Sequence, residues 1–465
     1  MHPVIRLSAA VLGSTLLLPP AAGFAAEPAA GPRWPDPGVA LPAAGGGTVA
    51  GEESAGAGRF FPGGPDAAPG RYLVGLAGSR VAAAAVPAVA ADLTARYGGR
   101  VAHTYRRALH GFLALADART ARRLAADPAV AYVAADEWVH PTGRAGGPPG
   151  ARSWGQDRID QRTLPLDGSY TPGPAAGVTV YVLDSGARAT HVELAGRIAA
   201  GIDVVDNDMQ PQDCNGHGTF VAGVITGATV GVTRDATVTA VRTLNCGGGG
   251  LWANVARAID WMIGQHPDGA PAVANMSMAS PRNPAGDEPV RKGIADGITF
   301  VVAAGNDNGK DACTVSPAGV REAITVAATS RDDKRWAGSN AGGCVDLFAP
   351  GNGIAGPWHK TDDRMTGGTG TSFAAPHAAA AAALLLHREP ALTPRQVEQR
   401  LVGAATGDTV GDPKGSPGRL LYVAPPARGP APTRARPAAA RNPPPGGAAG
   451  GRQVVSRSGG PRTRR

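Results

Sequence analysis

Short, almost uninterrupted apolar runs recur along the second part of the chain and constrain its fold more than any other feature. They lie at residues 178–183, 238–241, 273–276, 298–303 and 324–327. Strands buried on both faces of a parallel sheet are apolar along their whole length, whereas half-exposed strands alternate. Helical spacing appears between the runs, as in Leu251, Val255, Ile259, Met262 and Ile263. The pattern predicts an α/β domain at 154–423 with a doubly wound, mostly parallel sheet, whose functional crevice lies beyond the carboxyl ends of the strands.

A smaller domain is predicted before this sheet, at residues 70–140. Its apolar patterns indicate strands and helices in the order β-α-β-β-α-β, which is a split βαβ arrangement of the α+β class. The expected segments are 71–76, 81–97, 100–105, 111–115, 118–126 and 129–139. We find no catalytic constellation in it, and a domain of about 70 residues is only marginally stable alone.

The remaining segments have the composition of targeting and linking sequences. Residues 1–26 contain Arg6, a short apolar core and small residues near Ala25, which is typical of a secretory signal peptide. A buried terminal strand or helix is the alternative to a signal peptide. The apolar core is too short to span a membrane. Residues 27–69 are expected to be a flexible linker, and 141–153 an exposed, unstructured linker suited to proteolytic cutting. The tail at 424–465 is Pro-, Gly- and Arg-rich and is expected to be disordered.

The net charge of +8 does not indicate a nucleic-acid partner. The tail from 424 onward holds nine arginines and no acidic residue, so the rest of the chain is close to neutral. Basicity therefore assigns no polyanion-binding function to the larger domain. A role of the tail in anchoring the protein to an anionic surface is a separate possibility.

Four residues with chemical potential follow predicted strands or begin predicted helices. Asp184 follows the run 178–183, Asn306 follows 298–303, His217 precedes an apolar helix, and Ser372 begins an alanine-rich one. Each alone could be a turn or capping residue. A doubly wound sheet would bring all four to one edge, where they supply a nucleophile, a general base, a carboxylate to orient that base and an amide for an oxyanion.

Three motifs make the chain recognisable. They are Val-Leu-Asp-Ser-Gly at 182–186, Asn-Gly-His-Gly-Thr at 215–219 and Gly-Thr-Ser-Phe-Ala-Ala-Pro-His at 370–377. Over residues 70–423 the chain resembles the subtilisin-like serine proteases (subtilases), and within them the secreted, aqualysin-type members of the proteinase K-like group. The resemblance implies a secreted serine endopeptidase that acts on proteins or peptides, is made as a self-processed zymogen and is monomeric. It also implies that 70–140 is an inhibitory propeptide.

The resemblance implies a role for each site residue. Ser372 would be the nucleophile, His217 the base and Asp184 its partner, while the Asn306 side chain and the Ser372 backbone N–H would stabilise the oxyanion. It places the walls of the substrate pockets at Gly247, Gly248, Gly249, Gly250, Ser277, Met278, Ala279, Ala303, Ala304 and Gly305. A flexible surface loop is the alternative for the four glycines.

Two departures from the family pattern bear on substrate preference. The family usually has Leu-Gly-Gly where this chain has Met278-Ala279-Ser280, and the Cβ of Ala279 could narrow the primary specificity pocket. Phe220 stands where relatives have His, and we expect only a packing change there.

The four cysteines are expected to form two disulfides, because export implies an oxidising compartment. Sequence alone leaves three connectivities open. The resemblance implies Cys214–Cys246 and Cys313–Cys344.

No cofactor is expected for catalysis, but Ca²⁺ is expected as a structural ion. Hard oxygen ligands gather at Asp157, Asp160, Gln161, Asp167 and Ser169, with Asp346 a second candidate. Proteinase K-like proteins of this type bind Ca²⁺ in the matching segment, although acidic surface turns would give the same composition. Asp206, Asp208 and Asp213 form a weaker third cluster.

Two competing functions use the same residues. An esterase could employ the same triad on a different acyl group. An inactive subtilase could serve as a secreted binding protein, although all four catalytic positions are filled.

Overall fold

The computed structural model describes residues 59–147 and 154–425. The predicted signal peptide at 1–26, residues 27–58 of the predicted linker and residues 426–465 of the predicted tail lie outside these ranges. None of the helices in the described ranges is long and apolar enough to cross a membrane.

The N-terminal domain is built on an antiparallel sheet with the strand order β5-β2-β4-β3, while β1 runs parallel to β5. Each segment expected from the sequence is present, and the β-α-β-β-α-β order is confirmed. The elements are β1 (Arg59–Phe61), β2 (Ala67–Leu76), η1 (Ala83–Ala85), α1 (Val86–Tyr97), β3 (Arg100–Tyr105), β4 (Gly111–Leu115), α2 (Ala118–Ala125) and β5 (Val130–Pro141).

The expected flexible linker at 27–69 is wrong at its end. Residues 59–61 form β1, and β2 begins at Ala67. Backbone pairing with β5 orders this segment, and Gly64 N–H donates to the Glu137 carboxylate over 2.7 Å. Such pairing with a distant strand leaves no periodic pattern in the local sequence.

The larger domain contains a seven-stranded, fully parallel sheet with the order β16-β15-β13-β11-β7-β9-β8. The apolar runs all form its strands, as predicted. The strands are β7 (Thr179–Asp184), β8 (Ile198–Asp203), β9 (Thr237–Arg242), β11 (Ala272–Met276), β13 (Thr299–Ala303), β15 (Ile324–Thr329) and β16 (Leu347–Pro350).

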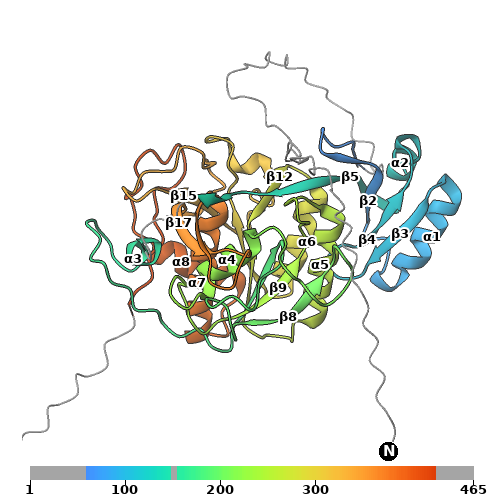
Figure 1. Cartoon of the computed structure of the whole chain (residues 1–465). Coiled ribbons are helices and arrows are strands. Elements are labelled where there is room, and N and C mark those ends of the chain that lie inside the picture. Colours follow the sequence, from blue (N-terminus) through green and yellow to red (C-terminus); the bar gives the residue numbers. More distant parts are fainter. Residues whose placement is uncertain (1–58, 148–153, 426–465) are drawn as a thin grey trace, which may run out of the picture. The chain divides into compact units, whose positions relative to one another are not determined.

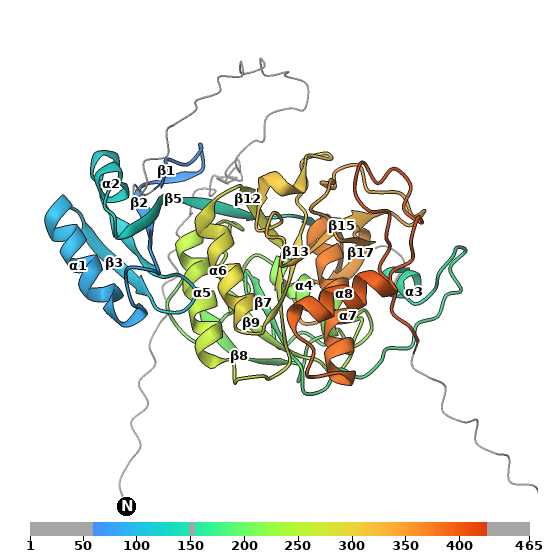
Figure 2. The same ribbon diagram turned by 180° about the vertical axis from the view of Figure 1, so that it is seen from behind.

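Helices cover both faces of this sheet, which explains why its strands are apolar throughout. Val180 and Val182 of β7 belong to one core cluster with α4 (His217–Thr226), α7 (Thr371–Arg388) and α8 (Pro394–Ala404). Tyr181 and Leu183 belong to the other, with α5 (Trp252–Gln265) and α6 (Pro284–Ala295). Figures 1 and 2 show the two helix layers from opposite sides. The doubly wound α/β fold is therefore confirmed.

The N-terminal sheet buries its two faces in different ways. Helices α1 and α2 cover one face around a core that includes Val74, Leu93 and Leu124. The other face packs on α5 and α6, where Tyr105 and Leu109 share a core with Trp252 of the larger domain. The Tyr105 hydroxyl donates to the Ala253 carbonyl over 3.1 Å.

Carboxylates also fasten the two domains together. Oδ1 of Asp260, on α5, accepts the backbone N–H groups of Arg106, Arg107 and Ala108 at 3.0, 2.6 and 2.9 Å. In the opposite direction, Asp136 of β5 accepts the Ala253 N–H at 2.9 Å near the start of α5. Backbone N–H groups in the first turn of a helix have no partner within the helix, so this carboxylate supplies one.

Strand β5 runs on beyond its own domain (Figure 1). Its end pairs antiparallel with the short strands β10 (Gly250–Leu251) and β12 (Met278–Pro281), which belong to the larger domain. Strand β12 also pairs with β14 (Val315–Ser316). The chain then forms β6 (Arg144–Gly147), in a three-stranded sheet with β18 (Met365–Thr369) and β17 (Asn352–Pro357). The remaining helices are α3 (Trp154–Ile159) and η2 (Ala312–Thr314).

The expected exposed and unstructured linker at 141–153 is therefore wrong in its described part, because 144–147 is a strand and Thr142 is buried. The backbone of β18 orders this Gly- and Arg-rich segment.

Candidate active site

A carboxylate and an imidazole meet at the carboxyl end of the parallel sheet. Asp184 is the last residue of β7 and His217 is the first of α4. His217 Nδ1 lies 2.8 Å from Asp184 Oδ1 and 2.9 Å from Oδ2, and both side chains are buried. A carboxylate on Nδ1 fixes the tautomer with its proton on that nitrogen and leaves Nε2 free to accept one. The pair has the arrangement of a general base and its orienting group.

Asp213 sets the position of His217, although the sequence indicated it only as part of a weak acidic cluster. Its Oδ1 accepts the N–H groups of Asn215 and Gly216 at 2.9 and 2.7 Å. Its Oδ2 accepts the Thr219 N–H at 2.9 Å, in the first turn of α4. The carboxylate thus caps the helix that begins with His217.

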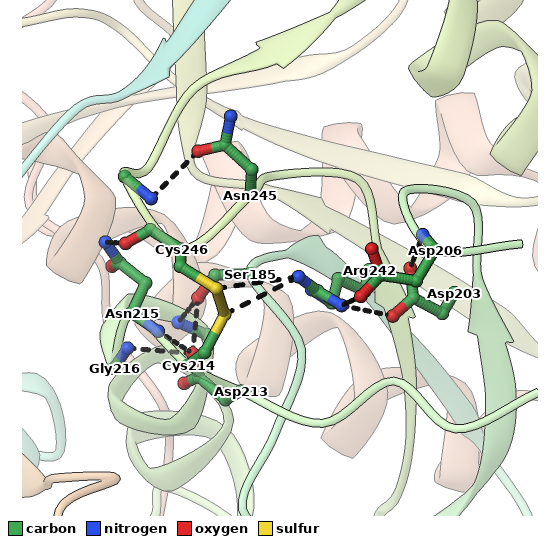
Figure 3. Close-up of a disulfide and its surroundings, with 12 residues drawn as sticks. Ser185, Asp203, Asp206, Asp213, Cys214, Asn215, Gly216, Arg242, Asn245 and Cys246 are labelled. Carbon is green, nitrogen blue, oxygen red and sulfur yellow. Dashed lines mark hydrogen bonds and ion pairs between the residues drawn. A yellow bond between two sulfur atoms is a disulfide. The ribbon is translucent and has the colours of Figure 1, made fainter. Parts of the chain in front are cut away.

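The cluster of Asp206, Asp208 and Asp213 is not brought together. Asp206 and Asp203 both pair with the Arg242 guanidinium, at 2.5 Å each. Figure 3 shows Asp203 and Asp206 on one side of the Arg242 guanidinium, with the disulfide and Asp213 on the other.

The disulfide Cys214–Cys246 braces the loop that carries His217 (Figure 3). It joins this loop to the segment before Gly247–Gly250, and Asn215 Nδ2 donates to the Cys246 carbonyl over 3.1 Å. Arg242 Nη2 lies 3.5 Å from Cys214 Sγ and 3.8 Å from Cys246 Sγ. The second disulfide is Cys313–Cys344, so both predicted pairings are confirmed.

Ser372 is the second residue of α7 and is fully buried. Its Oγ donates to the Ser277 carbonyl over 2.9 Å, and the Ser277 hydroxyl donates to the Ser372 carbonyl over 2.9 Å. The Oγ also lies 2.9 Å from the hydroxyl of Thr142. His217 Nε2, in contrast, is buried and has no hydrogen-bond partner in the described part of the chain. Ser372 and His217 are both in the site, but no hydrogen bond joins their side chains in the described part of the chain.

Two donors converge on one backbone carbonyl beside Ser372. The Ser372 N–H donates to the Thr142 carbonyl over 2.9 Å, and Asn306 Nδ2 donates to the same oxygen. Asn306 Oδ1 accepts the N–H and the hydroxyl of Thr371 at 3.0 and 2.8 Å, which aims the Nδ2 end at the carbonyl. This is the geometry of an oxyanion hole. Its occupant, Thr142, carries no sequence motif, and only the long-range pairing of β5 brings it here.

The segment on either side of Thr142 lies across the site as an extended strand. Before Thr142, His140 pairs with Ala279, Pro141 with Met278, and Val139 with Gly250. The Thr142 N–H donates to the Ser277 carbonyl over 3.0 Å. After it, residues 144–147 pair with β18.

Gly143 leaves little room for any other residue. A Cβ on it would lie 2.8 Å from both Ser372 Cβ and Phe373 Cε2. Phe373 is in turn packed on Phe220, with the ring centroids 4.3 Å apart. A larger residue after Thr142 would therefore push against Ser372.

The predicted substrate-pocket residues divide into those that reach the extended segment and those behind it. Gly250, Ser277, Met278 and Ala279 contact it through the backbone pairs above, although the Met278 side chain is buried in the core beneath. In the glycine loop, the N–H groups of Gly247 and Gly249 donate to Asn245 Oδ1. A Cβ on Gly248 or Gly249 would contact Pro141 at 3.5 Å or Trp138 at 3.1 Å. Ala303, Ala304 and Gly305 are buried beside Asn306, and Gly305 N–H donates to the Thr371 hydroxyl.

The predicted calcium ligands are only partly brought together. Asp157 accepts the Gly168 N–H, Gln161 Oε1 accepts the Asp167 N–H, and Asp167 accepts the N–H and hydroxyl of Ser169. Burial, with smaller contributions from Asp167 and Asp157, raises the pKa of Asp160 to about 6.

The second candidate, Asp346, accepts the Thr325 N–H over 2.7 Å, and burial raises its pKa to about 7. Both raised values mark carboxylates that an added cation would stabilise. Nevertheless, within residues 59–147 and 154–425 no three Asp, Glu, His or Cys side chains are grouped closely enough to hold a metal ion.

Comparisons with known proteins agree with this geometry. Residues 175–425 match the subtilase family, and residues 80–142 match the peptidase inhibitor I9 family. The chain is 42% identical over 378 residues to the extracellular serine proteinase of Thermus sp. (strain Rt41A), covering 77% of this chain and 90% of the relative.

Two further similarities point the same way. Alkaline serine exoprotease A of Vibrio alginolyticus is 40% identical over 329 residues, covering 70% of this chain and 61% of that protein. The crystal structure of a cold adapted subtilisin-like serine proteinase is 43% identical with a TM-score of 0.56, covering 58% of this chain and 98% of that one.

Proposed function

Because the chain belongs to the subtilase family and is a serine endopeptidase made as a zymogen with an I9 inhibitor segment, we propose that Asp184, His217 and Ser372 are its catalytic triad. In this assignment Ser372 Oγ attacks the carbonyl carbon of the substrate. His217 Nε2 takes the proton and later gives it to the leaving amine. Asp184 holds the imidazole by Nδ1 and stabilises its charged form.

Asn306 and the Ser372 backbone N–H form the oxyanion hole in this proposal. Both donate to the carbonyl of Thr142, which stands where the carbonyl of a bound substrate would be. Fixed donors aimed at the developing negative charge lower the barrier without having to reorganise during the reaction.

The observation that most supports this function is that the protein's own chain occupies the site as a substrate would. The strand pairs on both sides of Thr142, and the two donors on its carbonyl, single out the Thr142–Gly143 peptide bond. We propose that the zymogen cuts this bond itself. The inhibitory propeptide then ends at Thr142 rather than at 140, and the catalytic region begins at Gly143.

Residues 138–141, which precede the proposed cleavage site, inhibit the enzyme because they occupy the cleft as a substrate would. Residues 138–141 add a strand between β10 and β12, and added strands bind through the main chain. Together with the face that packs on α5 and α6, this strand keeps other peptides out of the cleft until the N-terminal domain leaves.

Secretion, a monomeric state and calcium binding complete the proposal. The relative from Thermus is named an extracellular proteinase, and residues 1–26 have the pattern of a signal peptide. Calcium would be held by the oxygens of Asp157, Asp160, Gln161, Asp167 and Ser169, and at a second site by Asp346. When bound, the ion would supply positive charge that keeps these carboxylates ionised and braces the loops. Chelation by EDTA should then lower the melting temperature, and an unchanged value would exclude a structural role.

Refolding of the full chain tests the self-cleavage. The wild type should yield a fragment that begins with Gly143, identified by mass spectrometry, and should then hydrolyse peptides. Ser372→Ala should stay intact while retaining the far-UV circular dichroism of the wild type. Asn306→Ala should cleave itself about 10² to 10³ times more slowly. Cleavage of Ser372→Ala at the wild-type rate would show that the nucleophile is elsewhere.

A further inference from the structure

The hydroxyl of Thr142 contacts the nucleophile directly. Its Oγ1 lies 2.9 Å from Ser372 Oγ, and both side chains are buried. Thr142 is the residue whose carbonyl lies in the oxyanion hole, so its side chain sits just before the bond proposed to be cut. The side chain of Thr142 is therefore hydrogen-bonded to Ser372 Oγ, the atom that has to attack the Thr142 carbonyl carbon.

The hydrogen bonds of Ser372 fix which group donates. A serine hydroxyl has one proton to donate and two lone pairs that accept. Ser372 Oγ directs its proton to the Ser277 carbonyl, which can only accept. In the bond between the two hydroxyls, Thr142 is therefore the donor and its proton occupies a lone pair of Ser372 Oγ.

The general base, meanwhile, has nothing to accept. His217 Nδ1 is held by Asp184, but His217 Nε2 is buried and has no partner among the described residues. For reaction, Ser372 must turn its proton toward Nε2 and direct a lone pair at the Thr142 carbonyl carbon. The present bonds oppose both movements.

We propose that the Thr142 hydroxyl acts as a brake on self-cleavage, by holding Ser372 in an orientation that cannot react. The proposal rests on the triad and on the Thr142–Gly143 bond assigned above. In the reaction, a bond forms between Ser372 Oγ and the Thr142 carbonyl carbon, and the bond to the Gly143 nitrogen breaks. The serine proton moves through His217 to the leaving amine, and water later hydrolyses the ester.

Of the two bonds that hold Ser372, only the one from the Thr142 hydroxyl depends on which residue precedes the scissile bond. The Ser277 carbonyl is part of the backbone and accepts the Ser372 proton whatever residue precedes the scissile bond. The second bond exists only when that residue carries a hydroxyl on Cβ. The enzyme should therefore cut more slowly after threonine or serine than after valine, in its own chain and in other substrates. One neutral hydrogen bond predicts a difference of about tenfold.

Self-cleavage of three full-length chains tests the brake. Thr142→Val keeps the branched shape and removes the hydroxyl, whereas Thr142→Ser keeps the hydroxyl. After dilution from denaturant, the loss of precursor and the appearance of the fragment beginning at Gly143 are followed with time. We expect Thr142→Val to cleave about tenfold faster than the wild type, and Thr142→Ser to remain within about twofold of it.

A second measurement separates the hydroxyl from effects on folding. The mature enzyme is given peptides with the sequence of residues 138–147 that carry Thr, Ser or Val at the position of Thr142. The hydroxyl should lower kcat and KM together, each by up to about tenfold, and leave kcat/KM nearly unchanged, because its bond to Ser372 stabilises the bound substrate before reaction and is absent from the transition state. A side chain that merely fits its pocket badly would instead raise KM. If Thr142→Val fails to fold, this peptide series decides the question alone.

The outcomes distinguish this inference from the function on which it rests. Equal rates for the Val and Thr forms, or a Ser form as fast as the Val form, would reject the brake and leave the triad intact. Cleavage of the wild type at another bond, or unimpaired cleavage of Ser372→Ala, would overturn the proposed site and the brake with it.

Discussion

The two domains bury their sheets in opposite ways. The parallel sheet of the catalytic domain is covered on both faces by helices of that domain, and two disulfides close its loops. The N-terminal sheet has helices of its own on one face only, and the catalytic domain covers the other. The enzyme is thus self-contained, whereas the inhibitor depends on the enzyme for half of its core.

The polar contacts that join the two domains, in contrast, run in both directions. Burial of apolar surface between the domains is non-directional, but Asp260 and Asp136 fix the orientation by accepting specific backbone N–H groups across the boundary. A temporary inhibitor can have the correct orientation without an extensive core. Its removal uncovers the face of α5 and α6 on which it packs, but the packing of the parallel sheet against the helices of the catalytic domain does not depend on it.

Removing a disulfide should have the largest effect on the stability of the catalytic domain. Replacing Cys214 and Cys246 together by Ala should lower the free energy of unfolding of the catalytic domain by about 3 to 4 kcal/mol. It should also slow self-cleavage, because the loop that carries His217 loses its covalent link to the segment before Gly247–Gly250. Urea unfolding of the Ser372→Ala precursor would measure this loss of stability, and self-cleavage would be followed in chains that keep Ser372. The double replacement Cys313→Ala and Cys344→Ala is the matched control. An equal slowing of self-cleavage by both pairs would show that proximity to His217 does not matter.

Acid should weaken the catalytic domain through one buried histidine. Burial lowers the pKa of His377, on α7, to about 4, so the folded state keeps it neutral where the unfolded state is protonated. Its contribution is therefore present above pH 6.5 and is lost as the pH falls from 6.5 to 4. The loss can reach about 3 kcal/mol.

Unfolding of the Ser372→Ala precursor at several pH values would measure this slope. His377→Gln should flatten it, since an amide can still donate to the Phe373 carbonyl but does not titrate. A slope as steep in the variant as in the parent would place the acid sensitivity elsewhere.

Asp260→Ala should loosen the inhibitor without altering the chemistry. It removes three bonds from backbone N–H groups to a charged acceptor at a half-buried position, so release of the cleaved N-terminal domain should be about 10 to 100 times faster. The readout is the delay between cleavage of the precursor and the rise of activity on an added peptide. The same change at Asp268, an exposed residue beyond α5, serves as control and should leave the delay unchanged.

Removing a helix cap should have the smallest effect on stability. It also allows the same change to be made in each of the two domains. Asp117 accepts the Thr120 N–H at the start of α2, and Thr393 accepts the Gln396 N–H at the start of α8. Alanine at either position should remove about 1 kcal/mol. Hydrogen exchange should report the loss from Asp117→Ala in residues 59–142 and that from Thr393→Ala in the catalytic domain. A loss of protection in the catalytic domain caused by Asp117→Ala would contradict the independence of the enzyme.

The sequence allowed the sheets to be predicted because their signals are local. The run at 178–183 became β7 with a shift of one residue, since a strand buried on both faces must be apolar throughout. Asp184, His217, Asn306 and Ser372 were identified because each adjoins such a strand or begins a helix. Their expected meeting at one sheet edge agrees with the positions found.

The short strands could not be predicted, because distant partners stabilise them. Strands β6 and β12 have no local periodicity, and pairing with β18 and β5 orders them. Thr142 was missed for the same reason, since its importance depends on contacts with Ser277, Asn306 and Ser372. Asp213 was noticed only as one acid among several, because capping depends on where its carboxylate points.

The unbroken chain from β5 through Thr142 into β6 has a kinetic consequence. In the proposed self-cleavage, Thr142 and Ser372 are tethered in one molecule, so the reaction is unimolecular. A group held in this manner can act as if present at an effective molarity of about 10⁵ M or more. The rate constant of maturation should then be independent of protein concentration. An isolated molecule diluted into a large external volume would mature as fast as one among many, without meeting a second copy.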